Sequence, residues 1–176
     1  MSLLIVLVHL LSVFTIGNEA VVRLGGSGWR SVFEQGDFLR LFTSMFIHVG
    51  FLHLINNCVF GFVWIRAVEH QVGSGQTAAW YLVTGLVAGL VSCLFQDVLS
   101  AGSSGALFGM TGMVFGLKAR RAPSFSDFLD DREIMSNAAS IVIFSWIGYD
   151  VFDHYAHVGG LATGFLAGRF LVRLDD

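Results

Sequence analysis

Long apolar stretches alternate with short polar connections along this chain, and the charged residues collect in the connections. Apolar runs of this kind are typical of helices that cross a membrane. The pattern therefore predicts an all-α polytopic membrane protein, with six transmembrane helices in a single domain over residues 1–176. The six apolar segments are Met1–Ile16, Leu41–Ile65, Thr77–Phe95, Ser104–Leu117, Ile134–Tyr149 and Ala156–Leu171.

The composition supports this class and excludes others. The chain is 55% hydrophobic and 13% charged, whereas a soluble domain carries roughly a quarter charged residues. A net charge of -3 offers no basic surface for nucleic acid. The two cysteines, Cys58 and Cys93, lie inside apolar segments and have no metal or redox spacing. We therefore expect no nucleic-acid partner, no cofactor and no metal.

The first segment is interpreted as a retained helix and not as a signal peptide. No basic residue precedes it, and residues 17–20 make a poor cleavage site. The segment is shorter than the roughly 20 residues that a membrane span needs. We therefore expect this helix to begin before Met1.

The basic residues give an orientation, because cytoplasmic connections carry an excess of lysine and arginine. With the N-terminus inside, seven basic residues fall on the cytoplasmic side and three fall in the long first loop, residues 17–40. The seven are Arg66, Lys118, Arg120, Arg121, Arg132, Arg169 and Arg173, and the three are Arg23, Arg30 and Arg40. Both termini are therefore predicted to be cytoplasmic. The first loop also contains apolar and aromatic residues, which favour a place in the outer membrane interface.

Polar residues that are unusual in lipid occur where the second, fourth and sixth segments begin, all at the outer face. His53 and Asn57 are four residues apart and share one face of a helix. Ser104 follows a glycine-rich turn, and His157 begins the sixth segment. Ionisable residues in membrane spans are costly and mark functional sites. Three distant parts of the chain thus deliver polar groups to one depth, which indicates a site.

Glycines are expected to bring two of these segments together. Gly160 and Gly164 follow His157 at helical spacing, and a row of glycines between residues 105 and 116 lies beside the face of Ser104. Small residues let membrane helices pack backbone to backbone. Such packing would place the serine and the histidine within hydrogen-bond reach.

A serine beside a histidine has the chemistry of a nucleophile with its base. A serine hydroxyl needs an adjacent base at neutral pH, and histidine is the usual one. Amides at the start of a helix, together with His53 and Asn57, would face the oxyanion that the attack creates. The residues therefore predict a Ser104–His157 dyad with an oxyanion hole.

Plainer interpretations stay open for these residues. Ser103 and Ser104 could cap a helix and let it pack tightly, and His53 with Asn57 could hold helices together by hydrogen bonds. A metal site is disfavoured, because the second segment has neither H-E-x-x-H spacing nor a carboxylate. The histidines that could have formed one are His48, His53, His154 and His157.

A carboxylate next to the histidine would turn the dyad into a triad. Asp150 and Asp153 are the candidates, since they precede the sixth segment by a few residues. Both are expected to face the outer interface. A dyad is therefore favoured over a triad.

Five stretches resemble, in order, motifs of the rhomboid intramembrane serine proteases, over about Phe38 to Gly168. Any one of these motifs is weak, whereas five in order with a fitting topology are specific. They are residues 39–48 (LRLFTSMFIH) for W-R-x-x-T-x-x-F-x-H, residues 53–57 for H-x-x-x-N, Glu69 with Gly73-Ser74 for E-x-x-x-G-S, residues 102–105 (GSSG) for G-x-S-G, and residues 156–164 for A-H-x-x-G-x-x-x-G.

The resemblance implies a role for each matching residue. Ser104, which alone stands in the G-x-S-G register, would be the nucleophile and His157 the general base. His53, Asn57 and the amide of Ser104 would line the oxyanion hole. The residues with structural roles would be Arg40, His48, Glu69, Gly102, Gly105, Phe108 and Gly160.

The resemblance also implies partners and a location. The substrates would be single-span membrane proteins, cut near the outer membrane boundary. The protein would be a multi-pass protein of a lipid bilayer, and we expect the inner membrane of a prokaryote.

Three features depart from the family pattern. Leu39 replaces the motif tryptophan, and Phe108 stands where many relatives have tyrosine, although its ring could still stack on His157. No seventh apolar segment follows the sixth.

The sequence leaves two alternative functions to compare. A catalytically inactive membrane adaptor or quality-control binder stays open, whereas a transporter is disfavoured because internal repeats and acidic residues at mid-membrane are not visible.

Overall fold

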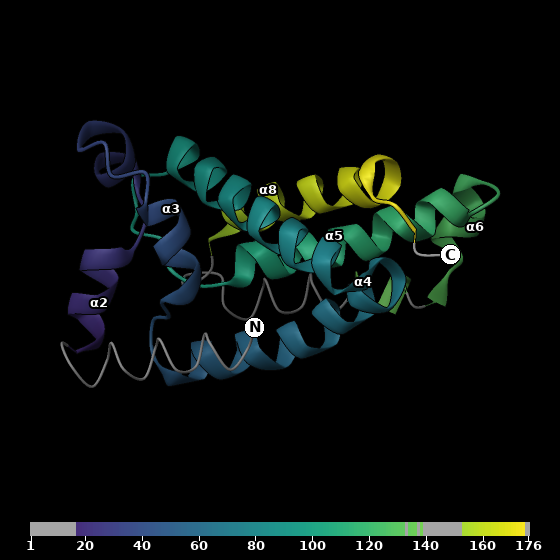
Figure 1. Cartoon of the computed structure of the whole chain (residues 1–176), viewed down its shortest axis with the longest axis horizontal. Coiled ribbons are helices and arrows are strands. Elements are labelled where there is room, and N and C mark those ends of the chain that lie inside the picture. Colours follow the sequence, from purple (N-terminus) through teal and green to yellow (C-terminus); the bar gives the residue numbers. More distant parts are fainter. Residues whose placement is uncertain (1–16, 133, 137, 139–152, 175–176) are drawn as a thin grey trace.

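The computed structural model describes residues 17–132, 134–136, 138 and 153–174, whose regular secondary structure is helical apart from one isolated β-bridge. The predicted first segment and most of the predicted fifth lie outside the described residues. The long helices are α4 (Phe51–Phe95), α5 (Ser104–Arg121) and α8 (His154–Leu166) (Figure 1). The short elements are α2 (Asn18–Gly25), η1 (Arg30–Glu34), α3 (Arg40–Thr43), η2 (Ser44–Phe46), α6 (Phe125–Leu129) and η3 (Ala167–Leu171).

Helix α4 consists of two arms that meet at Gly73. This residue has φ 75° and ψ 162°, a backbone conformation that glycine adopts without strain. The second arm runs back toward the end at which the first began (Figure 1). Across the turn, the Ser74 hydroxyl donates a hydrogen bond to Glu69 Oε1 at 2.6 Å. Glu69 therefore contacts the turn that its motif predicted.

The two arms have the length of membrane spans. Residues 51–72 and 74–95 are each roughly 33 Å long at 1.5 Å per residue, which matches a hydrocarbon core of roughly 30 Å. Among the helices that the structure describes, α4 alone is both long and apolar enough to pass as a membrane-crossing helix by length and composition. The count of six spans stays a prediction.

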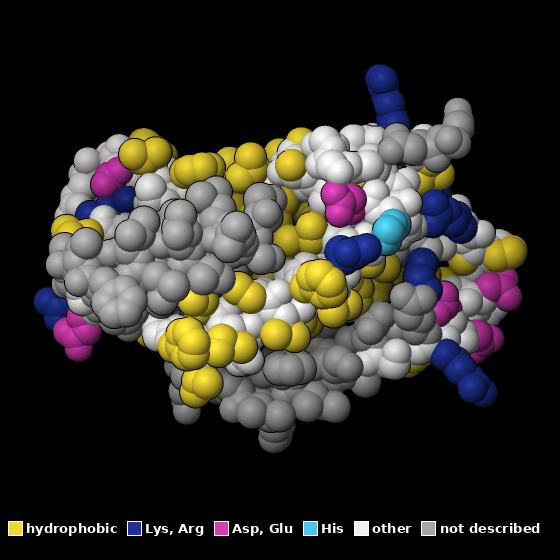
Figure 2. All heavy atoms as spheres, turned by 60° about the horizontal axis from the view of Figure 1, so that its bottom comes forward, with side chains coloured by type: hydrophobic (Ala, Val, Ile, Leu, Met, Phe, Trp, Pro, Cys, Tyr) yellow, Lys and Arg dark blue, Asp and Glu magenta, His cyan; other side chains and the backbone are white. Residues whose placement is uncertain are grey.

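Side chains of the first arm of α4 present a broad apolar surface. Figure 2 shows hydrophobic side chains over much of the coloured part of the visible face, with charged ones at its left end and over its right half. The exposed apolar residues of this arm include Phe51, Leu52, Ile55, Val59, Phe62 and Val63. A surface of this kind is suited to contact with lipid.

The predicted start of the second segment at Leu41 was wrong. Residues 40–46 form the short elements α3 and η2, and α4 begins only at Phe51. Gly50, with φ 84°, turns the chain just before it. Residues on both sides of this turn are apolar, so hydropathy alone could not reveal it. The fourth segment also ends later than predicted, at Arg121, where basic residues suit the negative end of the helix dipole.

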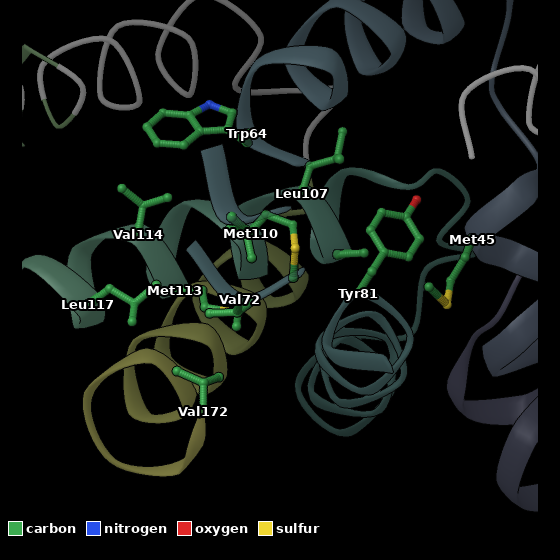
Figure 3. Packing of buried hydrophobic residues seen from close by; sticks show 12 residues of the cluster. Met45, Trp64, Val72, Tyr81, Leu107, Met110, Met113, Val114, Leu117 and Val172 are labelled. Carbon is green, nitrogen blue, oxygen red and sulfur yellow. The ribbon is translucent and has the colours of Figure 1, made fainter. Parts of the chain in front are cut away.

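Helix α5 packs against both α4 and α8 and contributes half of the buried cluster shown in Figure 3. Met110, Met113 and Leu117 point from it toward Val72 of the α4 turn and Val172 of the C-terminal segment. The full cluster is Met45, Trp64, Val68, Val72, Tyr81, Ala106, Leu107, Met110, Met113, Val114, Leu117 and Val172. Packing of this density fixes α5 in position.

The backbones of α5 and α8 touch through glycines, as the spacing predicted. A Cβ atom on Gly160 would overlap the carbonyl oxygen of Gly105, and one on Gly164 would overlap the carbonyl oxygen of Gly109. The same close approach continues along both helices, where Gly112 meets the carbonyl of Leu161, Gly116 that of Phe165, and Gly168 that of Met113. Only glycine permits such contact.

The first loop is held by Arg40, whose side chain is mostly buried. Its Nε contacts Asp37 Oδ2 at 2.8 Å, and its Nη1 donates to the carbonyls of Arg23 at 2.9 Å and Gly26 at 3.3 Å. Leu39, which replaces the motif tryptophan, is 67% exposed and takes no part in this packing of buried side chains. Arg40 thus lies in the structural position that its motif implied.

The first loop is also attached to the segment that leads into α5. Ser27 N donates to the carbonyl of Ser100 at 2.9 Å, and Ser100 N donates to the carbonyl of Ser27 at 2.7 Å. Gly102 N then donates to the carbonyl of Ser44 at 2.9 Å. These bonds fix the turn in which Ser103 and Ser104 lie.

Candidate active site

Ser104 and His157 meet at the starts of two helices. Ser104 is the first residue of α5, and His157 lies in the first turn of α8. Ser104 Oγ is 2.9 Å from His157 Nε2, and the histidine is only 5% exposed. The predicted hydrogen-bond distance between the two residues is therefore present in the structure. The glycine contacts between the two helices set this distance.

Phe108 fixes the plane of the histidine ring. It lies one turn after Ser104 on α5, and its ring is parallel to that of His157, with 4.0 Å between centroids and 5° between planes. The ring of Phe60 in α4 packs against Phe108 in turn, with 5.9 Å between the two ring centroids. The stacking expected for a phenylalanine at position 108 is confirmed.

Asp153 caps the start of α8. Its Oδ1 accepts a hydrogen bond from Ala156 N at 2.9 Å, and its Oδ2 accepts one from the hydroxyl of Ser92 in α4. Gln96 Nε2 donates to the same Ser92 Oγ at 2.9 Å. Both carboxylate oxygens of Asp153 are thus engaged in holding the helix start. Asp150, the other triad candidate, lies outside the described residues.

A cavity of about 70 Å³ opens beside the serine. Its volume gives room for water molecules. The residues that line it are Val49, His53, Leu99, Ser100, Ala101, Ser104 and Asp153. The serine hydroxyl and the His53 ring therefore share one small polar space. Asp153 lines it as well, whereas it was expected to face the outer interface.

His53 is held with a defined tautomer. Val49 N donates to His53 Nδ1 at 3.3 Å, so the proton of the neutral ring is on Nε2, where it can be donated. The ring lies against Gly102, which has φ 136°, and a Cβ atom there would come within 2.7 Å of His53 Cε1. Gly102 thus provides the space that the His53 ring occupies.

Asn57 and His48 do not line the cavity but lie behind it, around Ser103. Ser103 Oγ donates to Asn57 Oδ1 at 3.1 Å and is 3.3 Å from His48 Nε2. Asn57 Nδ2 donates in turn to the carbonyl of His53 at 2.8 Å. The sequence treated Ser103 only as the serine that is not the nucleophile. Its one signal was a second polar residue in a turn that is otherwise made of small apolar residues.

Two other motif residues, Glu69 and Arg40, lie away from this cavity, in the α4 turn and the first loop. Gly105 and Gly160 belong to the contact between α5 and α8. The site is thus formed by side chains from α4, α5 and α8, and the other motif residues position these helices.

Comparisons with known proteins show which family the chain is similar to. A family model described as "Rhomboid domain" matches residues 35–174. "RHOMBOID-like protein 7" of Arabidopsis thaliana is 29% identical over 160 residues, which are 88% of this chain and 50% of the relative. "Rhomboid protease GluP" of Bacillus subtilis (strain 168) is 32% identical over 157 residues, 88% of this chain and 30% of the relative.

A shorter relative, "Putative rhomboid protease YdcA" of Bacillus subtilis (strain 168), is 27% identical over 152 residues, 85% of this chain and 75% of the relative. The chain spans about half the length of the first curated plant relatives that it matches.

Proposed function

The chain belongs to the rhomboid family, and from this premise we propose that it is an intramembrane serine endopeptidase that uses Ser104 and His157. The members of this family are integral membrane proteins, some of which are proteases. The observation that carries the proposal is the distance of 2.9 Å between Ser104 Oγ and His157 Nε2. A serine at this distance from a neutral imidazole can lose its proton as it attacks.

The reaction follows from these two groups. Ser104 Oγ attacks the carbonyl carbon of the scissile peptide bond, and its proton moves to His157 Nε2. When the tetrahedral intermediate breaks down, the same proton goes to the leaving nitrogen, and an acyl-enzyme remains on Ser104. A water molecule from the cavity then attacks the acyl carbon and gives its proton to His157. His157 returns this proton to Ser104 Oγ as the bond to the acyl carbon breaks, and the second product leaves as an acid.

The negative charge of the intermediate would form next to the start of α5. The first N–H groups of a helix have no partner inside that helix, so the Ser104 amide is a donor to this oxyanion. The Nε2–H of His53 is a second donor, which its place in the cavity and its tautomer support. The side-chain amide of Asn57 is a third, from a position behind the cavity.

The membrane arrangement is part of the proposal. The chain would form a single domain over residues 1–176 with six spans, and both termini would be cytoplasmic. The site would then lie toward the outer face, where a single-span substrate is cut near the membrane boundary. The comparisons do not support the expected prokaryotic inner membrane, because the relatives include plant proteins, one of them named mitochondrial.

Labelling with a fluorophosphonate tests the proposal. This reagent forms a covalent bond with a serine that an adjacent base activates. The purified protein should be labelled, and Ser104→Ala and His157→Ala should not be. Absence of labelling in the wild-type protein, with a helical circular dichroism spectrum retained, would exclude the protease and leave a non-catalytic membrane adaptor.

A further inference from the structure

Ser103, directly before the proposed nucleophile, is a buried polar residue with two partners on another part of the chain. Its side chain is 1% exposed. Its hydroxyl lies 3.1 Å from Asn57 Oδ1 and 3.3 Å from His48 Nε2. A buried hydroxyl without a hydrogen-bond partner would destabilise the folded state. These contacts therefore satisfy a requirement of the fold.

Two hydrogen bonds together decide which way the amide of Asn57 faces, one from Ser103 and one to the carbonyl of His53. An asparagine side chain presents an oxygen that only accepts hydrogen bonds and a nitrogen that only donates them. The Ser103 hydroxyl donates to the oxygen, and the nitrogen donates to the carbonyl of His53 at 2.8 Å. The nitrogen is therefore held on the side of His53, which lines the cavity with Ser104.

We propose that Ser103 is a positioning residue for the oxyanion hole, whose hydroxyl locks the amide of Asn57 with its N–H groups toward the developing negative charge. This inference rests on the proposed function. His48 contacts the same residue, because its Nε2 lies 3.3 Å from the Ser103 hydroxyl and 3.4 Å from the Ser103 backbone nitrogen, and it is 0% exposed. Ser103 acts through Asn57 and does not itself touch the substrate.

The lock matters because a mispositioned amide would not stabilise the oxyanion. Without the Ser103 hydroxyl, the side chain of Asn57 loses the hydrogen bond to its oxygen and keeps the one from its Nδ2 to the carbonyl of His53. The amide can then turn about this remaining bond, so that its second N–H group no longer points at the oxyanion that it would have stabilised. The oxyanion exists only in the transition state, so the loss appears in kcat and not in KM.

The test is a double-mutant cycle between Ser103→Ala and Asn57→Ala on a model transmembrane substrate. Ser103→Ala should lower kcat about five- to tenfold, the effect of one hydrogen bond, with KM changed less than about twofold. In the Asn57→Ala background the same change should leave kcat within about twofold, because the amide that the hydroxyl orients is gone. Equal fractional losses in both backgrounds, or wild-type kcat in Ser103→Ala, would overturn the proposal.

A matched control separates this effect from a general loss of packing. Thr111 is another buried hydroxyl on α5 and donates to the carbonyl of Leu107 within its own helix at 3.1 Å. Thr111→Val should leave kcat unchanged, and the melting temperatures of all variants are measured alongside. A fall in kcat in Thr111→Val equal to that in Ser103→Ala would also overturn the proposal.

Fluorophosphonate labelling in the same preparation distinguishes the two levels of inference. Its adduct carries a phosphoryl oxygen in the oxyanion hole, so Ser103→Ala should be labelled about five- to tenfold more slowly. If the wild-type protein is not labelled at Ser104, the proposed function itself has failed. If the wild-type and Ser103→Ala proteins are labelled at equal rates, only the role of Ser103 has failed.

Discussion

The two ends of α5 hold their polar residues in different ways. At its start, Ser103 is buried and Ser104 meets His157 across two helices. At its end, Lys118 pairs with Asp131 at 2.8 Å while both side chains stay partly exposed. One helix therefore carries a buried polar cluster at one end and an ordinary charged anchor at the other.

The difference shows which polar residues can do chemistry. At the start of α5, Ser103 and Ser104 each contact a side chain from a distant part of the chain, and a small cavity lies beside Ser104. At the other end, basic residues complement the helix dipole, an effect that tolerates many geometries. In an apolar chain, polar residues indicate a functional site only where they are buried and contact side chains from distant segments.

The largest effect is expected from the base. His157→Ala should lower kcat by a factor on the order of 10⁴–10⁶, as loss of a catalytic histidine does in serine proteases. Asp153→Asn should keep most of the turnover, because asparagine also caps helices well and Asp153 is engaged with Ala156 and Ser92. Cleavage of a model transmembrane substrate measures both. A loss of several orders of magnitude in Asp153→Asn, without unfolding, would instead indicate a triad.

The next effect is expected from the oxyanion donors. His53→Ala should lower kcat on the order of 10²–10³, which corresponds to about 3–4 kcal/mol. Asn57→Ala should be milder, because Asn57 lies behind the cavity that His53 lines. His48→Ala should lose melting temperature together with activity, since its ring is buried against Ser103. Wild-type turnover in both His53→Ala and Asn57→Ala would make the α4 residues a scaffold only.

A smaller effect concerns the packing that the two helices share. Gly164→Ala should cost about 1–3 kcal/mol of stability, because the added methyl group overlaps the carbonyl of Gly109. Gly75→Ala is the matched control, since a Cβ atom there meets nothing within 4 Å and alanine favours a helix. Unfolding in one detergent should therefore show opposite signs for the two variants. A neutral Gly164→Ala would mean that the helices are not in backbone contact.

The smallest effect is expected at the far end of α5. Lys118→Met removes a partly exposed ion pair with Asp131 and should cost less than about 1 kcal/mol of stability. Its kcat should equal that of the wild-type protein. A large loss of turnover in this variant would contradict the contrast between the two ends.

Periodicity was enough to predict the central pair of the site. Glycines at helical spacing on two segments implied close packing, and that packing placed Ser104 beside His157. The family motifs located Arg40 and Glu69, which do hold the first loop and the α4 turn. Backbone contacts of this kind can be predicted, because they require glycines at regular helical spacing in the sequence.

Contacts between side chains on irregular segments have no such regular spacing in the sequence. The bonds that join Ser103 to Asn57 and His48 depend on how the turn before α5 folds back on α4. The start of α4 at Phe51 depends on the positive φ of Gly50 inside an apolar stretch. The place of Asp153 in the cavity likewise depends on the segment before α8. Each of these needs coordinates, because no period relates the residues.

The contact between α5 and α8 also makes the site insensitive to its surroundings. In most helix pairs of a membrane protein, side chains lie between the two backbones. These side chains can change rotamer when the lateral pressure of the lipid changes. Between Gly105 and Gly160, and between Gly109 and Gly164, no such layer exists, and backbone meets backbone. The distance between Ser104 and His157 is thus expected to be rigid, because close-packed groups are hard to compress. A change of bilayer thickness would then alter how a substrate presents its helix, while the distance between Ser104 and His157 stays the same.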